Sequence, residues 1–198
     1  MKHFNKKAVV IVCVLAVVLM WGIRVMDVRR RFPAKQITEC RINESIEYNP
    51  VIENIISANT TITPLGLTIY KHDEYIKDFP KMAEQYSAVK NYESLYAIVP
   101  TFSIRNNGTE PINAGQITAF FEIVNMRNSY SNGLIIMNNI VVQPGMTETV
   151  YMTALVSPST IGQENWSDFI NGDFIVLISQ YPVEQRLLYE KGKNQYRL

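Results

Sequence analysis

The chain has 198 residues, of which 47% are hydrophobic and 19% charged, with a formal net charge of +1. This total conceals two unlike parts: residues 1–35 carry a net charge of +7, and the rest, with 11 basic and 17 acidic residues, carries −6. The acidic part argues against general nucleic-acid binding, which depends on Lys and Arg neutralising phosphates, and the presence of only two cysteines excludes a disulfide framework.

The first feature along the chain is an apolar run near its start. Ala8 to Ile23 contains sixteen residues without a charge, preceded by Lys6 and Lys7 and followed by Arg24. A membrane-spanning helix needs roughly 20 mostly apolar residues. The run reaches about that length through Met26 if Arg24 extends its charged end to the interface. We therefore predict a basic tail at 1–7 and a transmembrane helix at 8–26.

A cleaved signal peptide is the main alternative to an uncleaved anchor. Cleavage requires small residues at the end of the apolar region. At the right depth the chain has Met20-Trp21-Gly22, which places a bulky Met at the first of the two key positions. Cys13 follows Val12 where a lipoprotein signal needs a small residue. We therefore expect the helix to remain as a signal anchor.

Basic residues flank the run on its C-terminal side and bear on orientation. This side carries Arg24, Arg29, Arg30, Arg31 and Lys35, against three lysines on the N-terminal side. The positive-inside rule alone would keep the following domain in the cytoplasm. We set against it the extracellular character of the rest of the chain and expect that domain outside the cell. The segment 27–36 is then a basic juxtamembrane linker whose arginines contact lipid headgroups.

From Leu95 onward the apolar residues follow a period of two. Between Tyr96 and Arg105 the pattern becomes a clean alternation, which predicts a half-buried strand. Pro100 cannot donate to a strand ladder and predicts an edge position or a bulge. After the turn residues Asn106-Asn107-Gly108, a second strand is expected, with one apolar face on Ile117, Ala119, Phe121 and Ile123.

The C-terminal half continues with short strands between turn signals. Apolar stretches at 134–137 and 140–142 precede a Pro144-Gly145 turn and a strand at 147–156. A short helix is expected beyond Pro158, with a Thr160–Gln163 capping box and an apolar side of Trp166, Phe169 and Ile170. Phe174 to Ser179 predicts a central strand, and after a break at Tyr181-Pro182 the residues 185–189 predict an edge strand. This spacing indicates a mainly β fold, an immunoglobulin-like antiparallel β-sandwich with one or two short helices.

The region between the anchor and residue 95 is less regular. Strands are expected at 37–42 and 66–70, followed by an insertion at 71–94. Within it, Asp78 could cap a helix that carries Phe79, Met82, Ala83, Tyr86 and Val89 on one face. This insertion is either a partner-binding lid or, as we favour, a helix that covers one open end of the sandwich. The extracellular domain is expected to span 37–198.

The residues that could carry chemistry are few. The histidines are His3 in the tail and His72, so a histidine triad or a multi-histidine zinc site could use only one. His72, Asp73, Glu74 and Tyr75 form the one candidate surface, although such a run is more often a solvated turn. Glycine-rich phosphate loops, CxxC pairs and GxSxG elbows are missing from the sequence. We expect no enzyme activity, no cofactor and no metal.

The layout of the chain also resembles a known group of proteins. A basic tail and one apolar helix are followed by Tyr48-Asn49-Pro50, the run 98–115 with Phe102-Ser103-Ile104-Arg105-Asn106-Asn107-Gly108, and the Pro144-Gly145 turn. This arrangement is similar to small exported proteins of Gram-positive bacteria, and in particular to the uncharacterised family called domain of unknown function 5028. The resemblance implies membrane attachment and a β-rich fold, and it carries no catalytic residues.

These observations favour a single-pass membrane protein whose extracellular sandwich serves as a binding or accessory module at the cell envelope. Its partners would be membrane lipid and an envelope component, not nucleic acid. Two alternatives stay open. One is a subunit of a membrane transport or export complex, in which the apolar helix packs against partner helices. The other, less favoured, is an envelope hydrolase that uses His72, Asp73 and Glu74.

Overall fold

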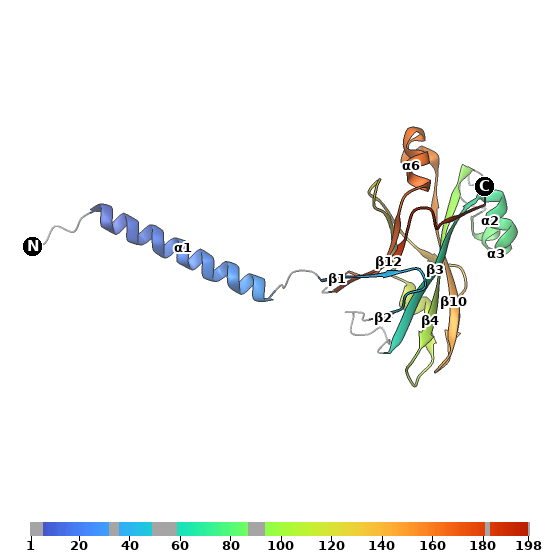
Figure 1. Ribbon diagram of the computed structural model, residues 1–198, viewed down its shortest axis with the longest axis horizontal. Coiled ribbons are helices and arrows are strands. Elements are labelled where there is room, and N and C mark those ends of the chain that lie inside the picture. Colours follow the sequence, from blue (N-terminus) through green and yellow to red (C-terminus); the bar gives the residue numbers. More distant parts are fainter. Residues whose placement is uncertain (1–5, 32–35, 49–58, 87–93, 181–182, 198) are drawn as a thin grey trace, which may run out of the picture. The chain divides into compact units, whose positions relative to one another are not determined.

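The computed structural model describes residues 6–31, 36–48, 59–86, 94–180 and 183–197. The chain divides into two compact units, Met1–Gln36 and Ile37–Leu198. The first unit contains a single long helix, α1 (Lys6–Arg31), and the second, which we call the head, contains the strands and the short helices (Figure 1). Each unit is described here by itself.

Two sheets form the head, and their strands come from distant parts of the chain. In sheet A the order is β1 (Gln36–Arg41), β12 (Val183–Tyr189), β11 (Phe174–Ser179), β6 (Glu122–Asn125) and β7 (Tyr130–Gly133). In sheet B the order is β13 (Gln195–Arg197), β3 (Thr60–Lys71), β4 (Tyr96–Asn106), β10 (Thr147–Val156) and β8 (Ile135–Ile136), and β2 (Ile46–Tyr48) also pairs with β3. A small ladder joins β5 (Ile112–Asn113) to β9 (Val141–Val142).

The inner faces of the two sheets enclose one apolar core. β4, β10 and β11 each contribute alternate side chains, among them Phe102, Val150 and Phe174, all of them fully buried. Each buried aromatic or aliphatic side chain of this size contributes about 1.5–3 kcal/mol. The main pairings within both sheets are antiparallel, whereas β13 lies parallel to β3. The predicted mainly β sandwich with a few short helices is confirmed.

The chain passes from one sheet to the other at both edges of the sandwich. β7 ends sheet A, and the chain continues through buried Leu134 into β8, which ends sheet B. On the opposite side β1 borders sheet A, and the next strand, β2, joins sheet B. Edge strands invite pairing with other chains, and the edge strands β7 and β8 are short, with four and two residues.

Three strands fall where the sequence pattern places them. β4 covers the predicted strand at 96–105 with one more residue, Asn106, and β10 and β11 coincide with the predicted 147–156 and 174–179. β11 is the middle strand of sheet A, as its continuous apolar sequence predicts.

A bulge explains why β3 is longer than the predicted 66–70. The pairing of β3 with β4 shifts between Pro64 and Gly66. The buried positions before the shift are even-numbered, Ile62 and Pro64, and those after it are odd-numbered, Leu67 and Ile69. One extra residue therefore interrupts the period of two, so the pattern is regular only beyond the bulge.

Two predictions of strand position are wrong: Pro100 lies at neither an edge nor a bulge, and β12 is not an edge strand. β4, which contains Pro100, lies between β3 and β10 in the middle of sheet B. The β4–β10 ladder instead lacks pairs at Pro100 and at Val99, which is how the missing N–H is accommodated. β12 was expected at an edge and lies between β11 and β1, because β1 (Gln36–Arg41), far earlier in the chain, pairs with it.

The predicted strand through Ile117 and Phe121 is also wrong. Residues Ala114–Thr118 form the helix α4, and only Ile123 of the predicted apolar face lies in a strand, β6. The Asn113 side chain accepts a hydrogen bond of 2.8 Å from the Gly115 N–H and caps this helix. The alternating apolar residues are therefore shared between a helical turn and a short strand.

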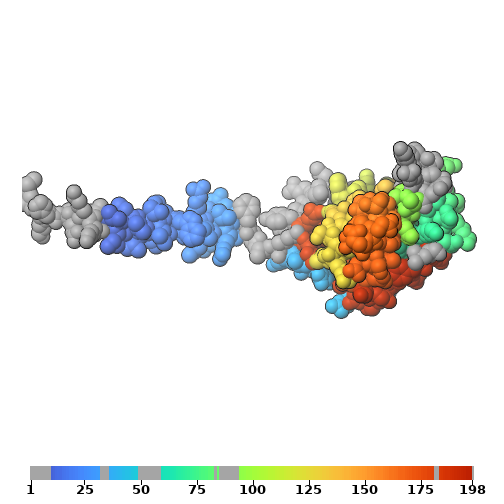
Figure 2. All heavy atoms as spheres, turned by 90° about the horizontal axis from the view of Figure 1, so that it is seen from above, coloured from blue at the N-terminus to red at the C-terminus, as the bar shows by residue number. Residues whose placement is uncertain are grey.

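Helical segments close one end of the sandwich. The predicted helix beyond Pro158 is split into α5 (Pro158–Ile161), η2 (Gln163–Asn165) and α6 (Trp166–Ile170). The cap of α5 is Ser157, whose Oγ accepts from the Thr160 N–H at 3.2 Å, so the predicted Thr160–Gln163 capping box is wrong. Figures 1 and 2 show this segment, coloured orange, over the upper end of the head. Phe169 is fully buried there, as predicted for the apolar side.

The insertion after β3 contains two helices instead of one. They are α2 (His72–Asp78) and α3 (Pro80–Tyr86). Asp78 ends α2 and does not cap α3. Pro80 is the first residue of α3, where the backbone N–H that proline lacks would have no partner within the helix. The helices pack through Tyr75, Phe79 and Met82 against outward-facing side chains of sheet B. They therefore cover a face of the sheet and not the open end. The predicted contact at Val89 and the break at Tyr181-Pro182 lie outside the described residues.

Candidate functional site

The helix α1 is the longest apolar feature of the protein. Its 26 residues extend about 39 Å at 1.5 Å per residue, more than the roughly 30 Å of a bilayer's hydrocarbon core. Large apolar side chains from Val10 to Met26 are mostly exposed, and none of the candidate span Val10–Arg31 is buried inside the structure. The helix is long and apolar enough to cross a membrane. A signal sequence near an N-terminus would meet the same test.

Basic side chains occupy the C-terminal part of α1. Arg29, Arg30 and Arg31 form its last turn, where cations interact favourably with the helix dipole. Arg31 Nη2 lies 3.0 Å from Asp27 Oδ2, one turn earlier. Along the described part of the chain, no ion pair joins Arg24, Arg29 or Arg30 to an acidic side chain. Lys6 and Lys7, the predicted flank at the other end, are the first two residues of α1.

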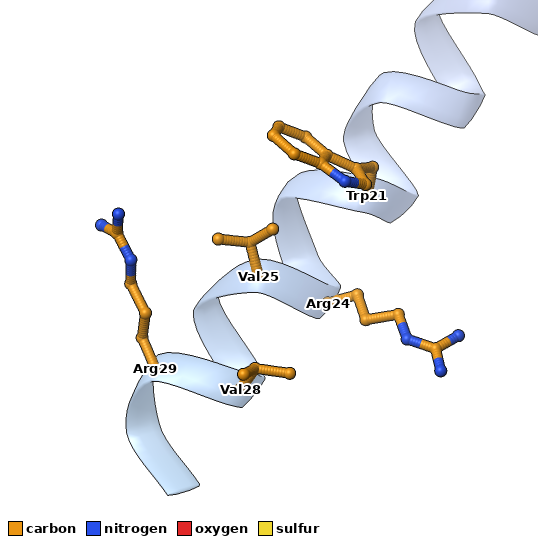
Figure 3. Close-up of a pocket in the computed structure, with 5 residues that line it drawn as sticks. All are labelled: Trp21, Arg24, Val25, Val28 and Arg29. Carbon is orange, nitrogen blue, oxygen red and sulfur yellow. The ribbon is translucent and has the colours of Figure 1, made fainter. Parts of the chain in front are cut away.

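An apolar notch lies on α1 between two of these arginines. Trp21, Val25 and Val28 form its floor, and Arg24 and Arg29 form its borders. At 100° per residue the five positions cover about 140° of the helix surface in the order Arg24, Val28, Trp21, Val25, Arg29. Figure 3 shows the two arginine side chains directed to opposite sides. The sequence analysis identified the arginines, but not the apolar strip that they border.

The second predicted surface, His72 to Tyr75, is the first turn of α2. His72 and Tyr75 are buried, and Asp73 is exposed. The His72 Nδ1 lies 3.2 Å from Asp73 Oδ1, and Glu74 pairs with Lys77 at 3.6 Å. Residues three apart on a helix share a face, so His72 and Tyr75 face the sheet while Asp73 is directed outward. The four side chains do not converge on one point.

Packing explains the burial of this turn. Tyr75 belongs to an aromatic group on the outer face of sheet B, with centroid distances of 6.0 Å to Tyr70 and 5.6 Å to Phe79. Phe79 in turn lies 5.8 Å from Tyr151 of β10. Arg197 of β13 stacks over Tyr70 at 5.8 Å and its Nη1 lies 2.6 Å from Asp78 Oδ2. These contacts attach α2 and the C-terminal strand to the sheet.

A small pocket lies at the edge of β3. β2 pairs with β3 at 60–62 and β13 pairs with it at 68–70, and the intervening stretch of this edge has no strand partner among the described residues. The pocket there has a volume of about 310 Å³ and includes Leu65, Gly66, Thr101 and Lys193 in its lining. This is near the lower limit of small-molecule sites. Sequence reasoning missed it because its walls come from strands far apart in the chain.

Burial in the head raises the pKa of three ionisable groups. Burial raises the pKa of the Cys40 thiol to about 11, and nearby Glu44 acts in the same direction. Burial also raises the pKa of Tyr48 to about 12 and shifts that of Tyr189 upward. All three groups are neutral at physiological pH. Among the described residues, no group of three or more His, Cys, Asp or Glu side chains is arranged as metal ligands.

The comparisons with known proteins give similarities of architecture. No family profile and no curated protein matches the chain. An uncharacterised β-sandwich protein from Clostridium difficile 630 is 14% identical, with a TM-score of 0.48, over 78% of this chain and 95% of that one. The yjhA protein from Bacillus subtilis is 9% identical, with a TM-score of 0.40, over 76% and 99%. A conserved hypothetical protein from Bacillus anthracis is 14% identical, with a TM-score of 0.34, over 67% and 90%.

All three TM-scores are below 0.5, so the sandwich assignment depends on the strand order and core of this chain. The resemblance to the domain of unknown function 5028 family stays a prediction.

Proposed function

We propose that the protein is a single-pass membrane protein that displays its β-sandwich head outside the cell as a binding or accessory module of the envelope. The observation that carries this proposal is α1. It combines an uncharged stretch of sixteen residues, apolar side chains left exposed, and basic residues at both ends. Transfer of about 16 apolar residues from water into lipid is favourable, whereas their exposure to water is not.

Retention of the helix as an anchor is supported by the residues at the end of its uncharged stretch. A signal peptidase needs small residues at the cleavage site, whereas the chain has Met20, Trp21 and Gly22 there, inside a helix that continues to Arg31. A helix that runs through the cleavage position hides the backbone that the peptidase must reach.

A binding or accessory role is supported by the head. Several of its buried polar side chains bond to backbone groups, among them Asn106, Thr118 and Asn125, and the pocket at the edge of β3 is small, at about 310 Å³. A β-sandwich presents its loops at the two ends of the sheets, where such folds commonly bind partners, and this head carries a net negative charge. The outward orientation rests on this character of the head, against the excess of arginines on the C-terminal flank.

Protease treatment of intact cells tests the orientation. The protein carries a C-terminal epitope tag, and protease is added before or after lysis. We expect the tag to be lost from intact cells while a cytoplasmic marker stays whole. A tag that survives until the cells are lysed would place the head in the cytoplasm and contradict the proposal. Digestion after lysis serves as the control that the tag is cleavable.

A further inference from the structure

The notch on α1 has the chemistry of a phospholipid site. Its floor is apolar, and Trp21 is the residue type enriched at the membrane interface. Its borders are two guanidinium groups that lack an ion pair among the described residues. Guanidinium is the side chain best suited to bind phosphate oxygens in pairs.

The axial order of these residues matches the order of groups in a lipid. At 1.5 Å per residue, Arg29 lies about 7.5 Å further along α1 than Arg24 and about 12 Å further than Trp21. If the apolar run lies in the hydrocarbon, Trp21 and Val25 lie at acyl and glycerol depth and Arg29 at headgroup depth. Arg24 lies deeper and on the other border, so its guanidinium adds positive charge beside the notch without reaching the level of Arg29.

Resting on the proposed membrane anchor, we propose that this notch binds one anionic phospholipid, whose acyl chain lies on Trp21 and Val25 and whose phosphate is held by Arg29, while Arg24 adds positive charge at the opposite border. The preference for an anionic lipid has a charge argument. Arg31 is compensated by Asp27 at 3.0 Å, whereas the arginines that border the notch are not compensated by a described acidic side chain. A zwitterionic headgroup would leave this excess positive charge unmatched.

Energy transfer from Trp21 to labelled lipids tests the proposal. The full-length chain with Trp166→Phe retains one tryptophan, Trp21. It is reconstituted into phosphatidylcholine vesicles that contain a trace of dansyl-labelled phosphatidylglycerol or dansyl-labelled phosphatidylcholine. We expect transfer to the anionic probe to exceed transfer to the zwitterionic probe at least two-fold.

Two further variants separate a site from a general attraction. Arg29→Gln and Arg30→Gln each remove one positive charge from the same turn, but only Arg29 borders the notch. Arg29→Gln should bring the transfer ratio close to one, and Arg30→Gln should leave most of the preference. Equal losses in the two variants, or no preference in the parent, would overturn the lipid site.

The same samples report on the anchor and on free anions. Blue-shifted Trp21 emission shows that the helix is inserted, so insertion without lipid preference contradicts this inference alone. Emission typical of water would contradict the anchor itself. Inorganic phosphate that abolishes the preference, while chloride of equal ionic strength does not, would indicate a site for a free anion and overturn the lipid assignment.

Discussion

We expect that the stability of the head depends strongly on the polar side chain of Asn106, the last residue of β4. Its side chain is 1% exposed. The Nδ2 donates to the carbonyl oxygens of Glu110 at 2.7 Å and of Val142 at 3.0 Å, and the Oδ1 accepts from the Gly108 N–H at 2.9 Å. Replacing Asn106 with Leu keeps the number and branching of the side-chain heavy atoms and removes all three hydrogen bonds.

The expected loss can be worked out bond by bond. The bond to Val142 is buried, and a buried acceptor left without a partner costs about 1–3 kcal/mol. The bonds to Glu110 and Gly108 are partly buried and contribute about 1 kcal/mol each. The free energy of unfolding should therefore fall by about 3–5 kcal/mol. For a head of this size, with an m-value of about 2 kcal/mol per molar urea, the midpoint should fall by about 2 M.

The assay is urea unfolding of a fragment of residues 37–198, followed by Trp166 fluorescence and by circular dichroism. Asn107→Leu is the matched control, because within the described residues the side-chain bonds of the adjacent Asn107, to Arg105 and Thr61, are exposed. It should cost about 1 kcal/mol or less. If Asn106→Leu costs no more than Asn107→Leu, the buried network does not hold this end of the sandwich and the reasoning is refuted.

Three further outcomes are expected. Phe169→Ala should lower the free energy of unfolding by about 3–5 kcal/mol in thermal circular dichroism, because the ring is fully buried and lies 5.5 Å from Trp166 and 5.4 Å from Phe174; a loss below 1 kcal/mol would contradict the core assignment. The raised pKa of Cys40, about 11 against its usual 9.0, means that the folded head keeps a proton that the unfolded chain releases. The free energy of unfolding should therefore fall as pH rises from about 9 toward 11, with a shallower fall in Cys40→Ala, and equal slopes in the two proteins would refute the linkage. Val17→Asp puts a charge at the centre of the apolar run, at a cost of about 3 kcal/mol, and should move much of the protein from the membrane pellet to the soluble fraction, whereas unchanged pelleting would exclude α1 as the anchor.

Period-two patterns predicted the central strands well. β10 and β11 have the predicted bounds, because central strands are buried on at least one face and their apolar residues must alternate or run continuously. Tertiary partners decided what the pattern could not show. Pro100 lies in a middle strand, and β12 lies between β11 and β1. Both placements depend on pairing with strands that are distant in the sequence.

Local competition explains the other differences. Ile117 and Phe121 fit an alternating face, but the Asn113 cap provides a helical alternative for the same residues. In β3 the bulge at Pro64–Gly66 shifts the buried face by one position, and the strand before it looked irregular. Asn106 was read as part of a polar turn, and the structure buries it among backbone carbonyls that a sequence cannot place.

The candidate site was predictable to a similar degree. Charge and hydropathy identified α1 and its arginines, because these two properties can be read from residues that are adjacent in the sequence. Two features could be recognised only from the three-dimensional structure. One is that His72 and Tyr75 face sheet B, and the other is the arrangement of Trp21, Val25 and Arg29 around the helix.

The central claim is that α1 stays attached to the head and holds it at the membrane. The most direct measurement is the intact mass of the protein recovered from membranes after an alkaline carbonate wash. We predict the mass of the complete chain, 22.7 kDa, in the washed pellet. A shorter species that lacks the residues of α1, recovered in the soluble fraction, would contradict the account.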